Sequence, residues 1–130
     1  MRRFIVLSTL ILAAACYHGP SLQDFGPALW PQGINADLQL DSISVEGELL
    51  EVQDSSLIVL TYLSKVVSVP VRSIQRGRFG KLGDLLPPDI DQKSALAKLR
   101  NFSRFPAGLP PELRARLLAA YGQTAVDVVR

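Results

Sequence analysis

Residues 45–60, VEGELLEVQDSSLIVL, carry the strongest structural signal in this chain. Apolar residues recur there at the spacing of a β-strand, and Gly47 falls in the middle of that strand. A glycine inside a strand indicates a tight curve or the close approach of another backbone. The sequence DSS at 54–56 then predicts a turn, and the apolar run at 57–60 predicts the next strand.

Short strands are also predicted on both sides of this stretch. Leu38 and Leu40 alternate with polar neighbours, and later apolar residues continue on the other parity, which suggests a bulge or bend near 41–42. Valines at 67, 69 and 71 share one face of a further strand, and Pro70 marks its edge or its end. With a last strand at 74–79, four to five strands predict a small bent β-barrel or an antiparallel sheet over 36–80.

The order of these features resembles that of Sm-like and SH3-like small barrels. The segment GELLEV at 47–52 is similar to the bent strand that carries a central glycine in those barrels, and VPVRSI at 69–74 is similar to their closing segment. The resemblance implies a small barrel over about a third of the chain. Sm-like proteins often bind RNA, but the residues here match no RNA-contact motif, so the resemblance assigns no binding residue.

Residues 81–130 predict a connector followed by two helices, which makes the whole chain an α+β protein. Asp91 is expected to cap a helix that ends near Phe102. Pro111 suits the first turn of a second helix, and Gly122 suits its C-terminal cap. The tail at 125–129 is expected to form a short strand or to dock as an apolar end.

The N-terminus has the pattern of an export signal over residues 1–15. Arg2 and Arg3 precede a twelve-residue stretch at 4–15 that is apolar except for a serine and a threonine. A membrane-spanning helix needs about 20 apolar residues, so this stretch is too short to span a bilayer. Its length and its small-residue end predict a cleaved signal peptide.

The sequence LAAAC at 12–16 resembles the lipobox of bacterial lipoproteins. The resemblance implies that Cys16 receives a diacylglyceryl group, becomes the first residue of the mature protein and is acylated again. The position three before the cysteine is commonly leucine in that family, and here it is Ala13. The residues at 13–15 also satisfy the A-x-A pattern of ordinary signal cleavage, which would leave Cys16 as a free thiol. Both alternatives place the cut at the same bond.

The resemblance to lipoproteins also implies a location. The expected partner is a membrane, held through lipid on Cys16, and the expected location is the cell envelope. In bacteria with two membranes, aspartate directly after the lipidated cysteine commonly retains a lipoprotein in the inner membrane. Here that residue is Tyr17, so we expect the outer membrane, with the domain facing the periplasm. Residues 16–35 are rich in glycine and proline and are expected to be a tether whose Phe25 and Trp30 dock onto the domain or lie in the membrane interface.

The charge balance argues against a nucleic-acid partner. Removal of the signal peptide lowers Lys+Arg from 14 to 12, against 12 Asp+Glu, so the mature chain is formally neutral. The charges are segregated: seven acidic residues and no Lys or Arg occur in 17–64, and five basic and no acidic residues occur in 65–81. Oppositely charged strands that pair across a sheet are the expected explanation. A surface that binds an anionic or envelope protein partner is the alternative, with candidate residues Arg72, Arg76, Arg78, Arg104 and Phe105.

The sequence offers few groups for catalysis. His18 is the only histidine and Cys16 the only cysteine, so His-containing catalytic triads and Cys/His zinc sites have too few residues, and no cofactor or metal is expected. Glu46 and Glu48 share one face of the predicted strand and are the candidate acid/base pair of a small hydrolase. We expect a membrane-anchored protein with a non-catalytic binding or structural role. The alternatives are a Sm-like nucleic-acid-binding protein and this carboxylate-dependent hydrolase.

Overall fold

The computed structural model describes residues 33–85 and 93–130. The predicted signal peptide, Cys16, Asp91 and the part of the predicted tether before Gly33 lie outside the described residues.

The described chain folds into a seven-stranded sheet and two helices, which confirms the α+β class. The strand order is β6-β5-β1-β2-β3-β4-β7, and all neighbours are antiparallel except β4 and β7. The strands are β1 (Asn35–Gln39), β2 (Ser44–Val52), β3 (Ser56–Thr61), β4 (Val66–Pro70), β5 (Arg76–Phe79), β6 (Gly83–Leu85) and β7 (Asp127–Val128). Short 3₁₀ helices at Val71–Ser73 and Gly80–Leu82 precede β5 and β6. The helices are α1 (Lys93–Phe102) and α2 (Pro111–Ala120).

The sheet is open, so the prediction of a closed barrel is wrong. Closure of the five central strands would require the free edge of β4 to meet the free edge of β5. Instead β7 pairs with that edge of β4, and β6 pairs with that edge of β5. The two added strands therefore occupy the hydrogen-bonding groups that closure would use.

The parity change near 41–42 marks a chain reversal and not a bulge. The amide of Leu40 donates to the carbonyl of Ile43 (2.9 Å), which closes a turn between β1 and β2. The bulge lies further along β2, where the pairing with β3 shifts between Leu49 and Glu51. Because the bulge inserts one residue, Leu49 and Val52 face the same core although their positions differ in parity.

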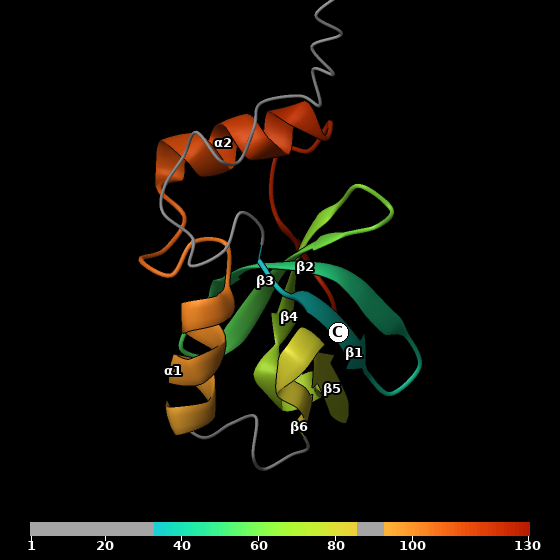
Figure 1. The fold of residues 1–130 in the computed structure, drawn as a ribbon. Coiled ribbons are helices and arrows are strands. Elements are labelled where there is room, and N and C mark those ends of the chain that lie inside the picture. Colours follow the sequence, from blue (N-terminus) through green and yellow to red (C-terminus); the bar gives the residue numbers. More distant parts are fainter. Residues whose placement is uncertain (1–32, 86–92) are drawn as a thin grey trace, which may run out of the picture.

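Each face of the sheet has its own apolar core and its own helix. On one face, Leu96 and Leu99 of α1 join the cluster that contains Leu49 and Val59. On the other face, α2 and the helix–helix junction cover a second cluster that contains Leu50. Figure 1 shows the two helices on different sides of the sheet. The apolar run at 57–60 follows from this layering, because its side chains alternate between two buried faces.

Gly47 lies where two backbones come unusually close. It pairs with Thr61 of β3, and a Cβ atom at Gly47 would lie 2.1 Å from the carbonyl oxygen of Leu60. This contact confirms the expectation of a close backbone approach at the central glycine. Pro70 ends β4, as its position predicted.

The helix boundaries confirm the predicted ends. The first helix ends at Phe102, the second begins at Pro111, and Gly122 follows it at a positive φ of 69°. The junction between them pairs with the bulged part of β2: the amide of Arg104 donates to Leu49 and the amide of Phe105 donates to Leu50. The predicted short strand in the C-terminal tail is β7.

Candidate functional site

Arg76 and Arg78 of β5 share one side of the sheet with the acidic strand β1. In the β1–β5 register, Asp37 lies opposite Arg78 and Gln39 lies opposite Arg76, and these four residues line a shallow hollow of about 330 Å³. One acidic residue of the acidic segment therefore lies opposite one basic residue of the basic segment, which is the kind of pairing that the segregated charges predicted. The shortest contacts, however, go to a carboxylate outside both segments.

That carboxylate is Asp84 of β6. Its Oδ2 accepts from Nη2 of Arg76 at 2.7 Å, and its Oδ1 accepts from Nε of Arg78 at 3.0 Å. The hydrogen bond with Asp84 raises the pKa of Arg78, and the hydrogen bonds from Arg76 and Arg78 lower the pKa of Asp84. Because one carboxylate bridges two guanidinium groups, this hollow attracts anions less than two unpaired arginines would.

An NMR titration of the Asp84 carboxyl is expected to give a pKa below the ordinary 3.8. Since the folded-state pKa is the lower one, ionised Asp84 stabilises the fold above the ordinary value, and this contribution is lost as the pH falls through the folded pKa. Arg76→Gln and Arg78→Gln should each raise this pKa. Arg72→Gln is the matched control, because Arg72 is exposed on the first 3₁₀ helix and does not line the hollow. An ordinary pKa in the unmodified protein would contradict the bridged geometry.

Arg104 and Phe105 take no part in that surface, because both are buried. Phe105 packs in the cluster under α2 and is 3 % exposed. The side chain of Arg104 is only 6 % exposed, and its Nε lies 3.7 Å from Oε1 of Glu48. Among the described residues, Nε and Nη1 of Arg104 make no hydrogen bond. The negative charge of Glu48 is therefore the main compensation for the buried positive charge of Arg104. The candidate interaction surface therefore loses these two residues.

Glu48 holds the chain where it enters the domain. Its Oε1 accepts from the amide of Gly33 at 2.8 Å, and the next residue, Ile34, donates to Phe102 and accepts from Leu49. A Cβ atom at Gly33 would lie 2.1 Å from the Leu49 carbonyl oxygen, so only glycine fits this entry point. Glu46 and Glu48 do lie two apart along β2, as predicted. Glu48 is engaged by Gly33 and Arg104, which gives it a structural role.

A third candidate site, the turn between β3 and β4, was not predicted from the sequence. The amide of Thr61 donates to Lys65 and the amide of Ser64 donates to Thr61, with Ser64 at a positive φ of 61°. This tight turn leaves Tyr62 67 % exposed and Leu63 86 % exposed. Turns usually carry polar or small residues, so the adjacent Tyr62 and Leu63 were the sequence signal that could have revealed this site.

The end of α2 lies beside this turn. Tyr121 lines two neighbouring hollows, one of about 240 Å³ that Tyr62 also lines and one of about 520 Å³ that Leu63 and Lys65 also line. Gln123 joins the two segments: its Oε1 accepts from the amide of Val66 at 2.7 Å and its Nε2 donates to the same residue's carbonyl at 3.0 Å. We call Tyr62, Leu63, Lys65 and Tyr121 the tip surface.

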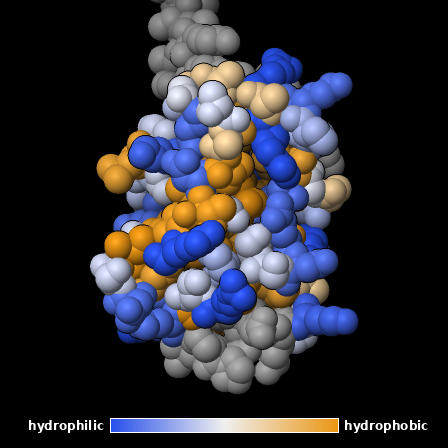
Figure 2. All heavy atoms as spheres, turned by 180° about the vertical axis from the view of Figure 1, so that it is seen from behind, coloured by the Kyte–Doolittle hydropathy of each residue, from blue (hydrophilic) through white to orange (hydrophobic). Residues whose placement is uncertain are grey.

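Apolar atoms reach the surface elsewhere as well. Figure 2 shows hydrophobic side chains gathered on the face turned away from the viewer in Figure 1. The exposed large apolar residues of the described chain are Ile43, Tyr62, Leu63, Tyr121 and Val128. Three of these five belong to the tip surface, which therefore holds most of the large apolar residues that are exposed in the described chain.

Comparison with models of protein families, with curated proteins and with solved structures finds no match to this chain. Within residues 33–85 and 93–130, neither helix is long and apolar enough to cross a membrane. The same residues contain no group of three or more His, Cys, Asp or Glu side chains placed to hold a metal ion.

Proposed function

We propose that this protein is an exported lipoprotein of the bacterial cell envelope, held to a membrane by lipid on Cys16, with a non-catalytic binding or structural role. The observation that carries the proposal is the sequence LAAAC at 12–16, placed directly after a charged and then apolar segment. Cys16 is the only cysteine of the chain, and lipidation gives it a function that an unpaired thiol in an oxidising compartment lacks.

The structure defines the point at which a tether from Cys16 would join the domain. Gly33 is hydrogen-bonded to Glu48, and Ile34 is hydrogen-bonded to Phe102 and Leu49. The attachment point of the segment that follows Cys16 is therefore fixed in the domain. Two or three acyl chains on one residue hold a protein to a bilayer far more firmly than a single chain, which gives only marginal binding.

A binding or structural role is favoured over hydrolysis by the state of the candidate carboxylates. Glu48 accepts from Gly33 and compensates Arg104, so it is not available as a general acid or base without loss of these contacts. A nucleic-acid partner is disfavoured by the neutral mature chain and by Asp84, which already engages Arg76 and Arg78. Because Tyr17 follows the cysteine, we propose the outer membrane in organisms that have two, with the domain in the periplasm.

Metabolic labelling with an alkynyl fatty acid tests the anchor. The unmodified protein is expected to incorporate the label and to sediment with membranes after a high-salt wash. Cys16→Ser should lose the label completely, because no other cysteine can replace it. Label that persists in Cys16→Ser would show that acylation occurs elsewhere. Density-gradient separation of the labelled membranes then decides the location, and recovery in the inner membrane would contradict the proposed outer-membrane address.

A further inference from the structure

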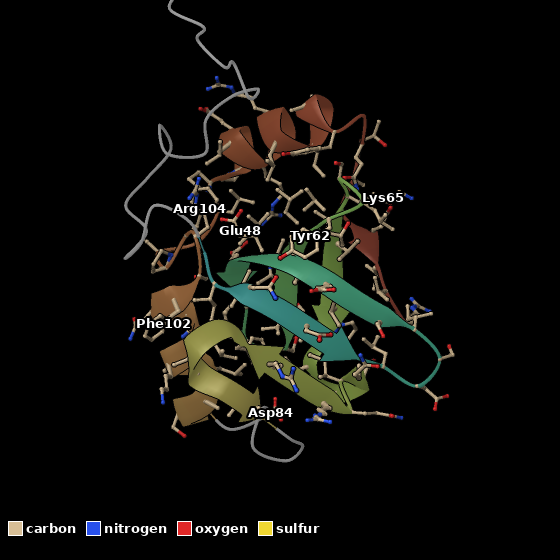
Figure 3. All side chains as sticks on the ribbon, turned by 45° about the vertical axis from the view of Figure 1, so that its right-hand side comes forward. Glu48, Tyr62, Lys65, Asp84, Phe102 and Arg104 are labelled. Atoms are coloured by element: carbon tan, nitrogen blue, oxygen red, sulfur yellow. The ribbon has the colours of Figure 1, made fainter. Side chains whose placement is uncertain are left out.

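The tip surface lies close to the point where the tether reaches the domain. The hydroxyl of Tyr62 donates to Oδ1 of Asn35, two residues after Gly33. Glu48, which accepts from the amide of Gly33, also lines the hollow that Tyr62 and Tyr121 share. Figure 3 shows Glu48, Tyr62 and Lys65 along the side of the sheet that faces α2. The entry point of the chain therefore lies beside Tyr62 and the hollow that Tyr62 and Tyr121 share.

The tip also has the composition of a membrane-interface contact. Tyrosine is favoured at the boundary between headgroups and hydrocarbon, where its ring is in an apolar region and its hydroxyl remains hydrated. Lysine can lay its methylenes along an apolar surface and keep its ammonium group in water. Leu63 lies in the turn between Tyr62 and Lys65, and 86 % of its surface is exposed. Exposure of an apolar side chain to water is unfavourable in free energy, whereas contact with lipid is favourable.

The length of chain between the anchor and the domain allows this contact. Sixteen residues lie between Cys16 and Gly33, so the distance between these two residues is at most about 60 Å when the segment is fully extended. One leucine and two tyrosines would bind a bilayer only weakly on their own. A covalent tether makes the second contact intramolecular, with an effective concentration on the order of millimolar, so a weak contact becomes populated.

We propose that the tip surface inserts into the phospholipid headgroup region of the membrane that carries Cys16, and thereby sets the orientation of the domain on that membrane. This inference rests on the proposed lipid anchor. The charges nearby are mixed, since Asp127 lines the same hollow as Lys65, so a zwitterionic bilayer is sufficient. Insertion would leave the hollow lined by Arg76 and Arg78, which shares no lining residue with the two hollows at the tip, available to other partners.

The test uses the full lipidated protein in phosphatidylcholine vesicles, with an NBD fluorophore on a single introduced thiol. Because Cys16 is acylated and no other cysteine exists, Leu63→Cys would carry the only label. The emission of NBD at position 63 is expected to shift to shorter wavelength, to rise several-fold and to be quenched by lipids with a nitroxide near the headgroup. Ser55→Cys is the matched control, because Ser55 is exposed at the opposite end of β3, and its label should remain aqueous.

Co-flotation with the vesicles reports on the anchor separately. Protein that floats while the label at 63 resembles the label at 55 would overturn the inference and leave the lipoprotein proposal intact. Equal blue shifts at both positions would indicate unspecific adsorption and also overturn it. A blue shift at 63 in the unlipidated Cys16→Ser chain without vesicles would assign the tip to contact between protein copies instead.

Discussion

Replacement of Gly47 by alanine is expected to lower the free energy of unfolding by about 3 kcal/mol, the upper part of the usual range for overpacking. The added Cβ would lie 2.1 Å from the carbonyl oxygen of Leu60 and 2.7 Å from the Cα of Thr61. Both atoms belong to the backbone of β3, so relief requires the β2–β3 ladder to separate. Urea denaturation of the unlipidated Cys16→Ser protein, followed by circular dichroism, measures the loss.

Gly122→Ala is the matched control for this substitution. Gly122 has a positive φ of 69°, but a Cβ atom added there would meet nothing within 4 Å beyond its chain neighbours, so only the conformational penalty of about 1 kcal/mol applies. Comparing the loss of stability in Gly47→Ala with that in Gly122→Ala separates a steric cause of destabilisation from a conformational one. Equal losses for the two variants would show that the close approach at Gly47 is relaxed in solution.

Replacement of Glu48 by leucine is expected to destabilise the fold by about 3–5 kcal/mol, as removal of one partner of a buried ion pair usually does. The side chain of Arg104 is 6 % exposed, and it would keep its charge without the carboxylate at 3.7 Å. The amide of Gly33 would also lose its acceptor. Arg104→Met should cost less, because Glu48 is 21 % exposed and keeps the hydrogen bond from Gly33.

The double variant Glu48→Leu/Arg104→Met distinguishes pairing from packing. If the two charges compensate each other, the double variant should be more stable than Glu48→Leu alone, and the cycle should give a coupling energy clearly different from zero. Additive losses would mean that Arg104 finds its compensation elsewhere. Thermal unfolding of the four proteins at neutral pH provides the comparison.

Local patterns predicted most of the elements in this domain. Helix ends at Phe102 and Pro111 and the strand end at Pro70 follow from the chemistry of single residues, and all three agree with the structure. The closed barrel was wrong because closure depends on what occupies the strand edges. The edges are occupied by β6, which has three residues, and by β7, which has two. Neither segment is long enough to show the period of a strand in its sequence.

The bulge shows a second limit of periodicity. A change of parity occurs both when a strand bulges and when the chain reverses, and the sequence alone did not separate the two cases at 41–42. The turn closed by Leu40 and Ile43 and the bulge at Leu49–Glu51 are distinguished only by their pairing partners. Contacts between residues that are distant in sequence also explain why the candidate site was only partly predicted.

The candidate site was predicted in part. Arg76 and Arg78 lie together on β5, as their spacing indicated, but the third member of that cluster, Asp84, comes from a strand that was not predicted. Arg104 was predicted to belong to an interaction surface, but it is buried beside Glu48, which is distant in sequence. The tip surface was not predicted because it combines Tyr121, which follows α2, with the turn between β3 and β4, and these two segments are distant in sequence.

The central claim is that Cys16 is a lipidated N-terminus, and intact-mass spectrometry of the membrane-extracted protein tests it most directly. The account predicts a chain that begins at Cys16 and is heavier by a diacylglyceryl group, with or without a third acyl chain, and a Cys16→Ser protein that carries no such mass. A chain that begins at Cys16 without added mass, or one that still contains residues 1–15, would contradict the account.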